Sequence, residues 1–176
     1  MDKAVFKVAW EESGDQVCRY AASAVAARNI PESAKDFLTT VGLPVEAAPF
    51  LTFDPNGNDR LAPCEGQTRF VLGSDGSGNP IVLDSHGVVW LVDHEEPTCS
   101  SLINSSIATL AECLVAYRAM VAKARTEGGD DAYLEGRIPM HLIAAFSETV
   151  HAVDPDATGP GTFWGEEISI FISGLA

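Results

Sequence analysis

Phe70-Val71-Leu72-Gly73, Ile81-Val82-Leu83-Asp84 and Val88-Val89-Trp90-Leu91-Val92 are the stretches that decide the fold of this chain. Short runs of β-branched and aromatic residues between turn residues are typical of successive antiparallel strands. The connections are short, because Ser74–Asn79 is a glycine-rich turn and Ser85-His86-Gly87 leaves room only for a tight one. We therefore predict a meander with strands at Arg69–Gly73, Pro80–Asp84 and Gly87–Asp93.

Helices are expected on the C-terminal side of the meander. Apolar residues recur at helical spacing from Ile107 to Val121, with Ser105 or Ser106 as the N-cap and Gly128-Gly129 as the end. A second helix is predicted from about Pro139 to Val153, followed by a loop. The closing segment, 163–175, fits two structures: Ile168, Ile170 and Ile172 alternate as in a strand, whereas Trp164, Ile168 and Phe171 have helical spacing.

The N-terminal side is less regular. Residues 1–12 alternate in polarity and are interpreted as an edge strand or a loosely attached arm. Helical spacing is predicted from about Ser13 to Arg28, and a further helix from Pro31 to about Gly42. A short strand is predicted at Pro49–Phe53, and Leu61–Thr68 is expected to be irregular. No repeat or linker divides the chain, so we expect residues 1–176 to form one domain.

The composition is that of a globular protein. The chain has 176 residues, of which 46% are hydrophobic and 20% charged. Its apolar runs are too short to span a bilayer, and Met1-Asp2-Lys3 does not begin a secretory signal, so we expect a cytoplasmic protein without membrane contact. The four cysteines, at 18, 64, 99 and 113, form no Cys-x-x-Cys pair and are expected to be free thiols.

Charge is the strongest global feature. There are 25 acidic residues against 11 basic ones, which gives a net charge of −14. Nucleic-acid affinity comes largely from Lys and Arg neutralising phosphates, so direct nucleic-acid binding is disfavoured. A basic protein partner would be attracted and steered. The alternative is that the acidic balance serves solubility alone.

The densest set of potential ligands comprises Asp84, His86, Asp93, His94, Glu95 and Glu96. If the hairpin folds as predicted, Asp84 and His86 flank one turn and Asp93–Glu96 lies at the far end of a strand. A strand of about six residues spans roughly 20 Å, so the two groups should not converge on one metal ion. We expect a solvated acidic loop, with no metal site and no cofactor.

Other patterns do not predict catalysis. The serines lack a Gly-x-Ser-x-Gly elbow, and Ser105 and Ser106 are explained by helix capping. Gly73–Gly78 lacks the Gly-Lys-Ser/Thr end of a phosphate loop, and Asp54–Asp59 lacks the closing Glu of a calcium loop. Asn104 is expected to form local hydrogen bonds before the long helix.

Two tryptophans are interpreted differently. Trp90 lies in the middle of a predicted strand whose two faces are both apolar, so we expect its ring in the core. Trp164 follows a loop rich in Gly and Pro, which fits either the core or a partner surface.

Taken in order, several segments resemble the SUKH superfamily of immunity proteins, and most closely its fourth subgroup, which is common in actinobacterial toxin loci. The matching segments are Ile30–Leu38, Val41-Gly42-Leu43-Pro44, Phe70–Gly73, Ile81–Asp84, Gly87–Trp90, Ile103–Ile107 and Phe163-Trp164. Each is weakly specific alone, and their order over roughly residues 30 to 175 carries the resemblance.

The resemblance implies an α+β fold, with an antiparallel-rich central sheet flanked by helices. It also implies a non-enzymatic protein that neutralises a cognate toxin, often a nuclease or a nucleobase deaminase, by direct binding. The charge adds the expectation that an acidic surface covers a basic groove of the toxin. To this partner-binding surface we assign Asp84, His86, Asp93, Glu95, Glu96 and Trp164.

Two other functions stay open at this point. One is a small hydrolase or ligand-binding enzyme that uses the acidic loop. The other is a general regulatory module for protein interaction.

Overall fold

The computed structural model describes residues 6, 9–10, 16–56, 62–64 and 67–173. Its central feature is an antiparallel sheet with the strand order β3-β4-β6-β7-β8-β9, in which β5 also pairs with β6. The bounds are β3 (Glu46–Ala47), β4 (Leu51–Phe53), β5 (Ala62–Cys64), β6 (Gln67–Ser74), β7 (Pro80–Leu83), β8 (Val89–Val92) and β9 (Ser100–Asn104). A separate pair consists of β1 (Val17–Cys18) and β2 (Leu43–Pro44).

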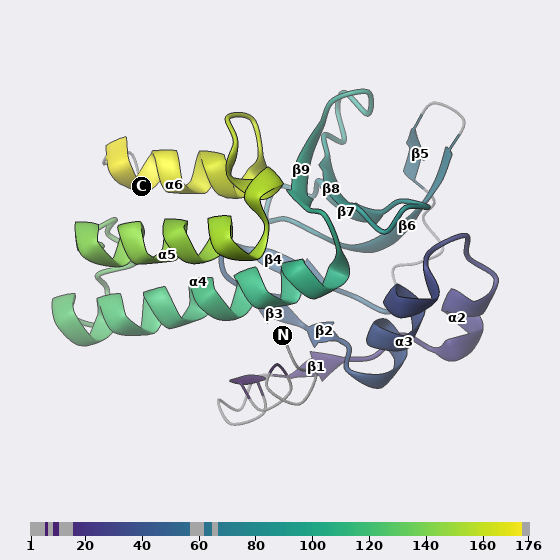
Figure 1. The fold of residues 1–176 in the computed structure, drawn as a ribbon, viewed down its shortest axis with the longest axis horizontal. Helices are drawn as coiled ribbons and strands as arrows, with labels where there is room; N and C mark the ends of the chain where they lie inside the picture. The colour runs from purple at the N-terminus through teal and green to yellow at the C-terminus, as the bar shows by residue number, and fades with distance from the viewer. Residues whose placement is uncertain (1–5, 7–8, 11–15, 57–61, 65–66, 174–176) are drawn as a thin grey trace.

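Three long helices form a layer beside the sheet (Figure 1). They are α4 (Ile107–Gly128), α5 (Met140–Val153) and α6 (Phe163–Ser173), and α5 contacts both of the others. Shorter helices are α2 (Ala22–Ala26), α3 (Glu32–Thr40) and the 3₁₀ turn η2 (Pro155–Thr158). The predicted α+β class, with a central sheet flanked by helices, is therefore confirmed.

The predicted meander is also confirmed. β6 pairs with β7 through Val71 and Val82, and β7 pairs with β8 through Val82 and Trp90. Sequence reasoning missed the next strand, β9, because Ser100 and Ser101 lack the apolar alternation of a strand. β9 instead pairs through its backbone along β8, with Leu102 opposite Trp90.

The helix predicted from Ser13 to Arg28 is wrong over most of its described length. Val17 and Cys18 form β1 against Pro44 and Leu43, and only Ala22–Ala26 is helical. Gly42 allows the chain to pass close to β1. Its φ of 87° favours glycine, and a Cβ at this position would collide with the backbone of Cys18. Ser13, where this helix was predicted to begin, lies outside the described residues.

Two further predictions need correction. The segment predicted to be irregular, Leu61–Thr68, contains β5 and the start of β6. In the N-terminal segment, most of which lies outside the described residues, Phe6 and Trp10 are helical and buried, not part of an edge strand or a loose arm. Their rings pack on each other, and Phe6 also contacts Phe37 of α3.

The C-terminal alternatives are resolved in favour of helix. Phe163–Ser173 forms α6, with Trp164, Ile168 and Phe171 buried and Ile170 and Ile172 exposed. The loop expected after Val153 begins with the short turn η2.

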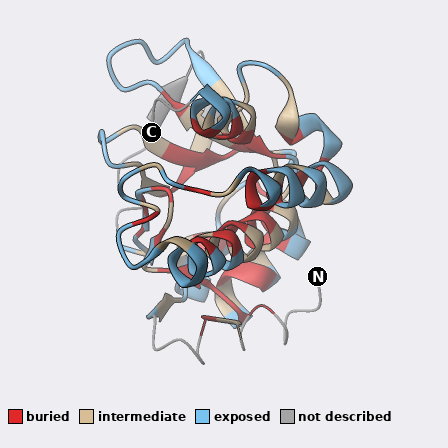
Figure 2. Cartoon of the chain, turned by 90° about the vertical axis from the view of Figure 1, so that its left-hand side faces the viewer, coloured by how far each residue is buried: buried red, intermediate tan, exposed pale blue. Residues whose placement is uncertain are grey.

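The main core lies between the sheet and the helices, where buried residues face one another in Figure 2. Tyr20, between β1 and α2, fastens that segment to β6, because its hydroxyl donates to the carbonyl of Leu72 at 2.6 Å. A smaller cluster of Val71, Val82 and Val92 lies apart from the main core. Trp90 packs against this smaller cluster and is only partly buried, which corrects the prediction of a ring enclosed in the core.

Candidate partner-binding surface

Strand register distributes the turns between two ends of the sheet. Val92 pairs with Ser100 and Leu91 with Ile81, so the β8–β9 turn lies at the same end as the β6–β7 turn. The β7–β8 turn, with Asp84 and His86, lies at the other end. The two groups of candidate ligands are therefore separated, as the sequence predicted.

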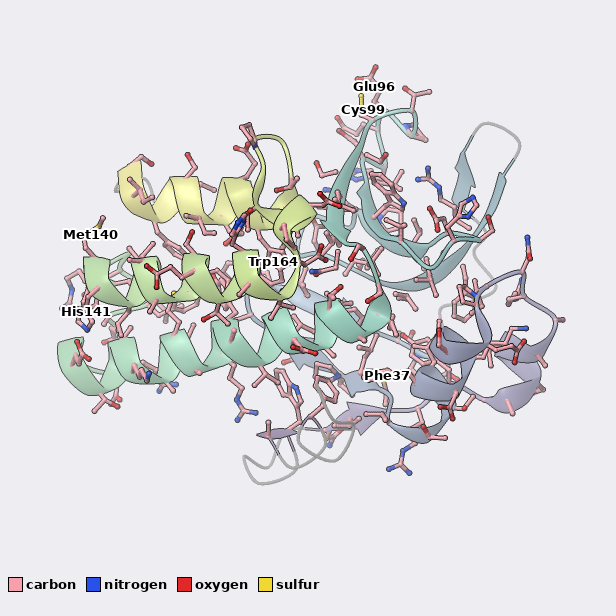
Figure 3. All side chains as sticks on the ribbon, viewed as in Figure 1. Phe37, Glu96, Cys99, Met140, His141 and Trp164 are labelled. Carbon is pink, nitrogen blue, oxygen red and sulfur yellow. The ribbon has the colours of Figure 1, made fainter. Side chains whose placement is uncertain are left out.

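The β8–β9 turn presents the acidic residues to solvent. Asp93, Glu95 and Glu96 are all exposed, and Glu96 and Cys99 project from the tip of the hairpin (Figure 3). Asp93 holds the turn in shape, because its Oδ1 accepts hydrogen bonds from the backbone N–H groups of Glu95 at 2.8 Å and Glu96 at 3.2 Å. The carboxylates of Glu95 and Glu96 are thus carried on a fixed turn.

A second turn supports this one. The Oδ1 of Asn79, in the β6–β7 turn, accepts from the backbone N–H of His94 at 3.1 Å and lies 2.8 Å from its ring Nδ1. Asn79 is itself held by Asp75, which accepts from its backbone and side-chain N–H groups. The two turns form one continuous surface with three carboxylates from the β8–β9 turn and one from Asp75.

Asp84 has a structural role at the opposite end. Its Oδ1 accepts from the backbone N–H groups of His86 and Val88 at 2.9 Å, and its Oδ2 accepts from the Trp90 indole at 3.0 Å. Both oxygens are therefore used to fix the β7–β8 turn. His86 is exposed on this turn, away from Asp93–Glu96.

Trp164 is not a surface residue. Its side chain is 0% exposed and is enclosed by rings that include Tyr117, Phe146 and Phe163. Its placement in the core removes it from the partner-binding residues assigned from the sequence. Figure 3 shows it between the helices and the sheet.

Asn104 fixes this part of the core through contacts distant in sequence, which corrects the expectation of local bonding. Its Oδ1 accepts from the Trp164 indole at 2.9 Å, and its amide donates to Asp154 at 2.9 Å. Asp154 is 2% exposed and also accepts from the backbone N–H of Ser105 at 2.7 Å. This buried carboxylate is satisfied by N–H donors, as a structural role requires.

Groups with shifted pKa values have structural explanations. Burial raises the pKa of Glu167 in α6 and of Tyr117 in α4, and the Tyr117 hydroxyl donates to Glu167 at 3.3 Å. This contact fastens α6 to α4. The charge of Glu96 raises the pKa of the exposed Cys99 thiol, which disfavours the nucleophilic thiolate.

Among the residues that the structure describes, no group of three or more His, Cys, Asp or Glu side chains is placed to hold a metal ion. Across the same residues, no helix is long and apolar enough to cross a membrane.

Sequence reasoning missed one exposed aromatic residue, Phe50, in the turn between β3 and β4. It was assigned to a short strand, which begins only at Leu51. The neighbouring Pro49 was the available signal, since proline favours a turn.

Comparison with known proteins gave one match. The family model for the SUKH-4 immunity protein matches residues 8–170, which is most of the chain. Neither the curated proteins nor the solved structures include a match.

Proposed function

Because this chain belongs to the SUKH-4 immunity protein family, we propose that it binds a cognate protein toxin and blocks the toxin's active-site groove with an acidic surface. The family match over residues 8–170 is the observation that carries the immunity function. We further propose that the toxin acts on nucleic acid, as a nuclease or a deaminase. Such enzymes hold phosphates with Lys and Arg, so their grooves are basic.

The charge of the chain supports this partner. At −14 the protein attracts a basic surface over long range, and the exposed carboxylates of the β8–β9 turn offer a local point of contact. Asp93 fixes the backbone of that turn before any partner arrives. A fixed turn loses less conformational freedom on binding than a loose one.

The test is the association rate with the protein encoded by the adjoining gene, made inactive if it is toxic, across a salt series. The variant is Glu95→Gln/Glu96→Gln, which removes two charges and leaves Asp93 to hold the turn. The control is Glu148→Gln/Asp156→Asn, which removes the same two charges from exposed positions in α5 and η2.

Wild-type association should slow steeply between 0.01 M and 0.15 M salt, as the Debye length falls from about 30 Å to about 8 Å. The hairpin variant should associate several-fold more slowly than the control, because its lost charges lie at the contact. An association rate that changes neither with salt nor in the Glu95→Gln/Glu96→Gln variant contradicts the acidic-surface proposal.

A further inference from the structure

Phe50 is the most exposed aromatic side chain among the described residues. It is 71% exposed, and its backbone has a φ of 54°, in the left-handed region that bulky residues rarely adopt. An isolated exposed apolar residue is ordinary on a protein surface. Phe50 differs because of what lies beside it.

An apolar cleft of about 500 Å³ adjoins this ring. One wall is the β3–β4 hairpin, including Ala48, Phe50 and Thr52, and the other includes Val121 of α4 and Tyr133. Trp10 and Arg118 also line the cleft, where Arg118 lies 4.7 Å from the centre of the Trp10 ring and donates to the carbonyl of Ala9 at 2.7 Å. A cleft of this volume has room for an apolar side chain.

Phe50 lies on the same surface as the two acidic turns, which are the β6–β7 turn with Asp75 and the β8–β9 turn with Asp93–Glu96. Thr52 pairs with Ser74, which places the β3–β4 turn at the same end of the sheet as the β6–β7 turn. Gly76 of that turn touches Phe50, since a Cβ added at Gly76 would lie 3.2 Å from the Phe50 Cβ. From Gly76 the surface continues through Asp75 and Asn79 to His94 and the β8–β9 turn.

We propose that the toxin docks across this end of the sheet, with Phe50 and its cleft as the apolar centre of the contact and the two acidic turns as its charged rim. This inference rests on the proposed function and adds the site. Tight protein interfaces commonly join a central aromatic anchor to a polar rim. The partner surface that fits is basic, with an apolar pocket for the Phe50 ring and an apolar side chain for the cleft.

The test is the dissociation constant of the adjoining-gene protein with wild type and three variants. Phe50→Asn removes the ring, and Asn tolerates the left-handed backbone. Thr52→Arg leaves Phe50 in place and puts bulk and positive charge into the cleft. The control is Met140→Gln, which removes a side chain that is 59% exposed at the start of α5, away from the β8–β9 turn (Figure 3). Circular dichroism of each variant checks the fold.

Phe50→Asn should weaken binding by about 30-fold or more, as expected for an aromatic anchor, and Thr52→Arg by a similar factor. Met140→Gln should bind as wild type does. If Phe50→Asn and Thr52→Arg both bind with the dissociation constant of wild type, the docking site is overturned and the proposed function still stands. Absence of wild-type binding overturns both. Sedimentation of the protein without its partner tests one more outcome. If the wild type is a dimer and Phe50→Asn is a monomer, the surface binds a second copy of this chain, which also overturns the proposal.

Discussion

At the scale of single residues, Trp90 in β8 and Trp164 in α6 differ in burial and in the hydrogen-bond partner of the indole N–H. Trp164 is enclosed, with its Nε1 donating to buried Asn104, whereas Trp90 is partly exposed, with its Nε1 donating to Asp84. Trp164→Ala should therefore lower the free energy of unfolding by about 3–5 kcal/mol, because it leaves a cavity and an unpaired amide oxygen. Trp90→Ala should cost less, about 2 kcal/mol, since its ring loses less burial. Urea unfolding followed by circular dichroism compares them, and equal costs contradict the difference in burial.

At the scale of elements, the start of α4 depends on one of two adjacent serines. Ser106 is the N-cap: its Oγ accepts from the backbone N–H of Thr109 at 3.1 Å, and the Thr109 hydroxyl accepts from the Ser106 backbone N–H at 3.1 Å. Ser105 uses only its backbone N–H, toward Asp154. Ser106→Ala should lower the free energy of unfolding by about 1 kcal/mol, because a helix donor loses its acceptor.

Ser105→Ala is the matched control for the cap, because it removes an identical hydroxyl one residue away and keeps the bond to Asp154. It should change the denaturation midpoint little. If Ser105→Ala lowers the free energy of unfolding more than Ser106→Ala does, Ser105 rather than Ser106 is the N-cap.

At the scale of the whole molecule, the charge of −14 affects folding as well as association. Like charges repel within the compact state, and salt screens that repulsion. Raising NaCl from 0.01 M to 0.15 M should therefore raise the melting temperature at pH 7, although the same salt slows association with a basic partner. Near the isoelectric pH of about 4.4 the salt effect on melting should largely vanish. A melting temperature at pH 7 that stays constant or falls with salt contradicts this account.

The sequence by itself determined the local features of this protein. The β6–β8 meander, the long helix ended by glycines and the helix after Pro139 follow from periodicity and turn chemistry, which act over a few residues. It also placed Asp84 and Asp93 at opposite ends of a strand, since strand length fixes that separation. The order of motifs was sufficient to indicate the family.

Only the tertiary structure decided which side chains are buried and which turns meet. The sequence around Trp164 fits either the core or a partner surface, and its contacts with Tyr117 and Asn104 place it in the core. β1 and β9 form because backbone groups find partners elsewhere in the chain, which leaves little trace in their own residues. Phe50 lies beside the acidic turns for the same reason: pairing between β4 and β6 joins residues twenty or more positions apart, and no local pattern encodes such a contact.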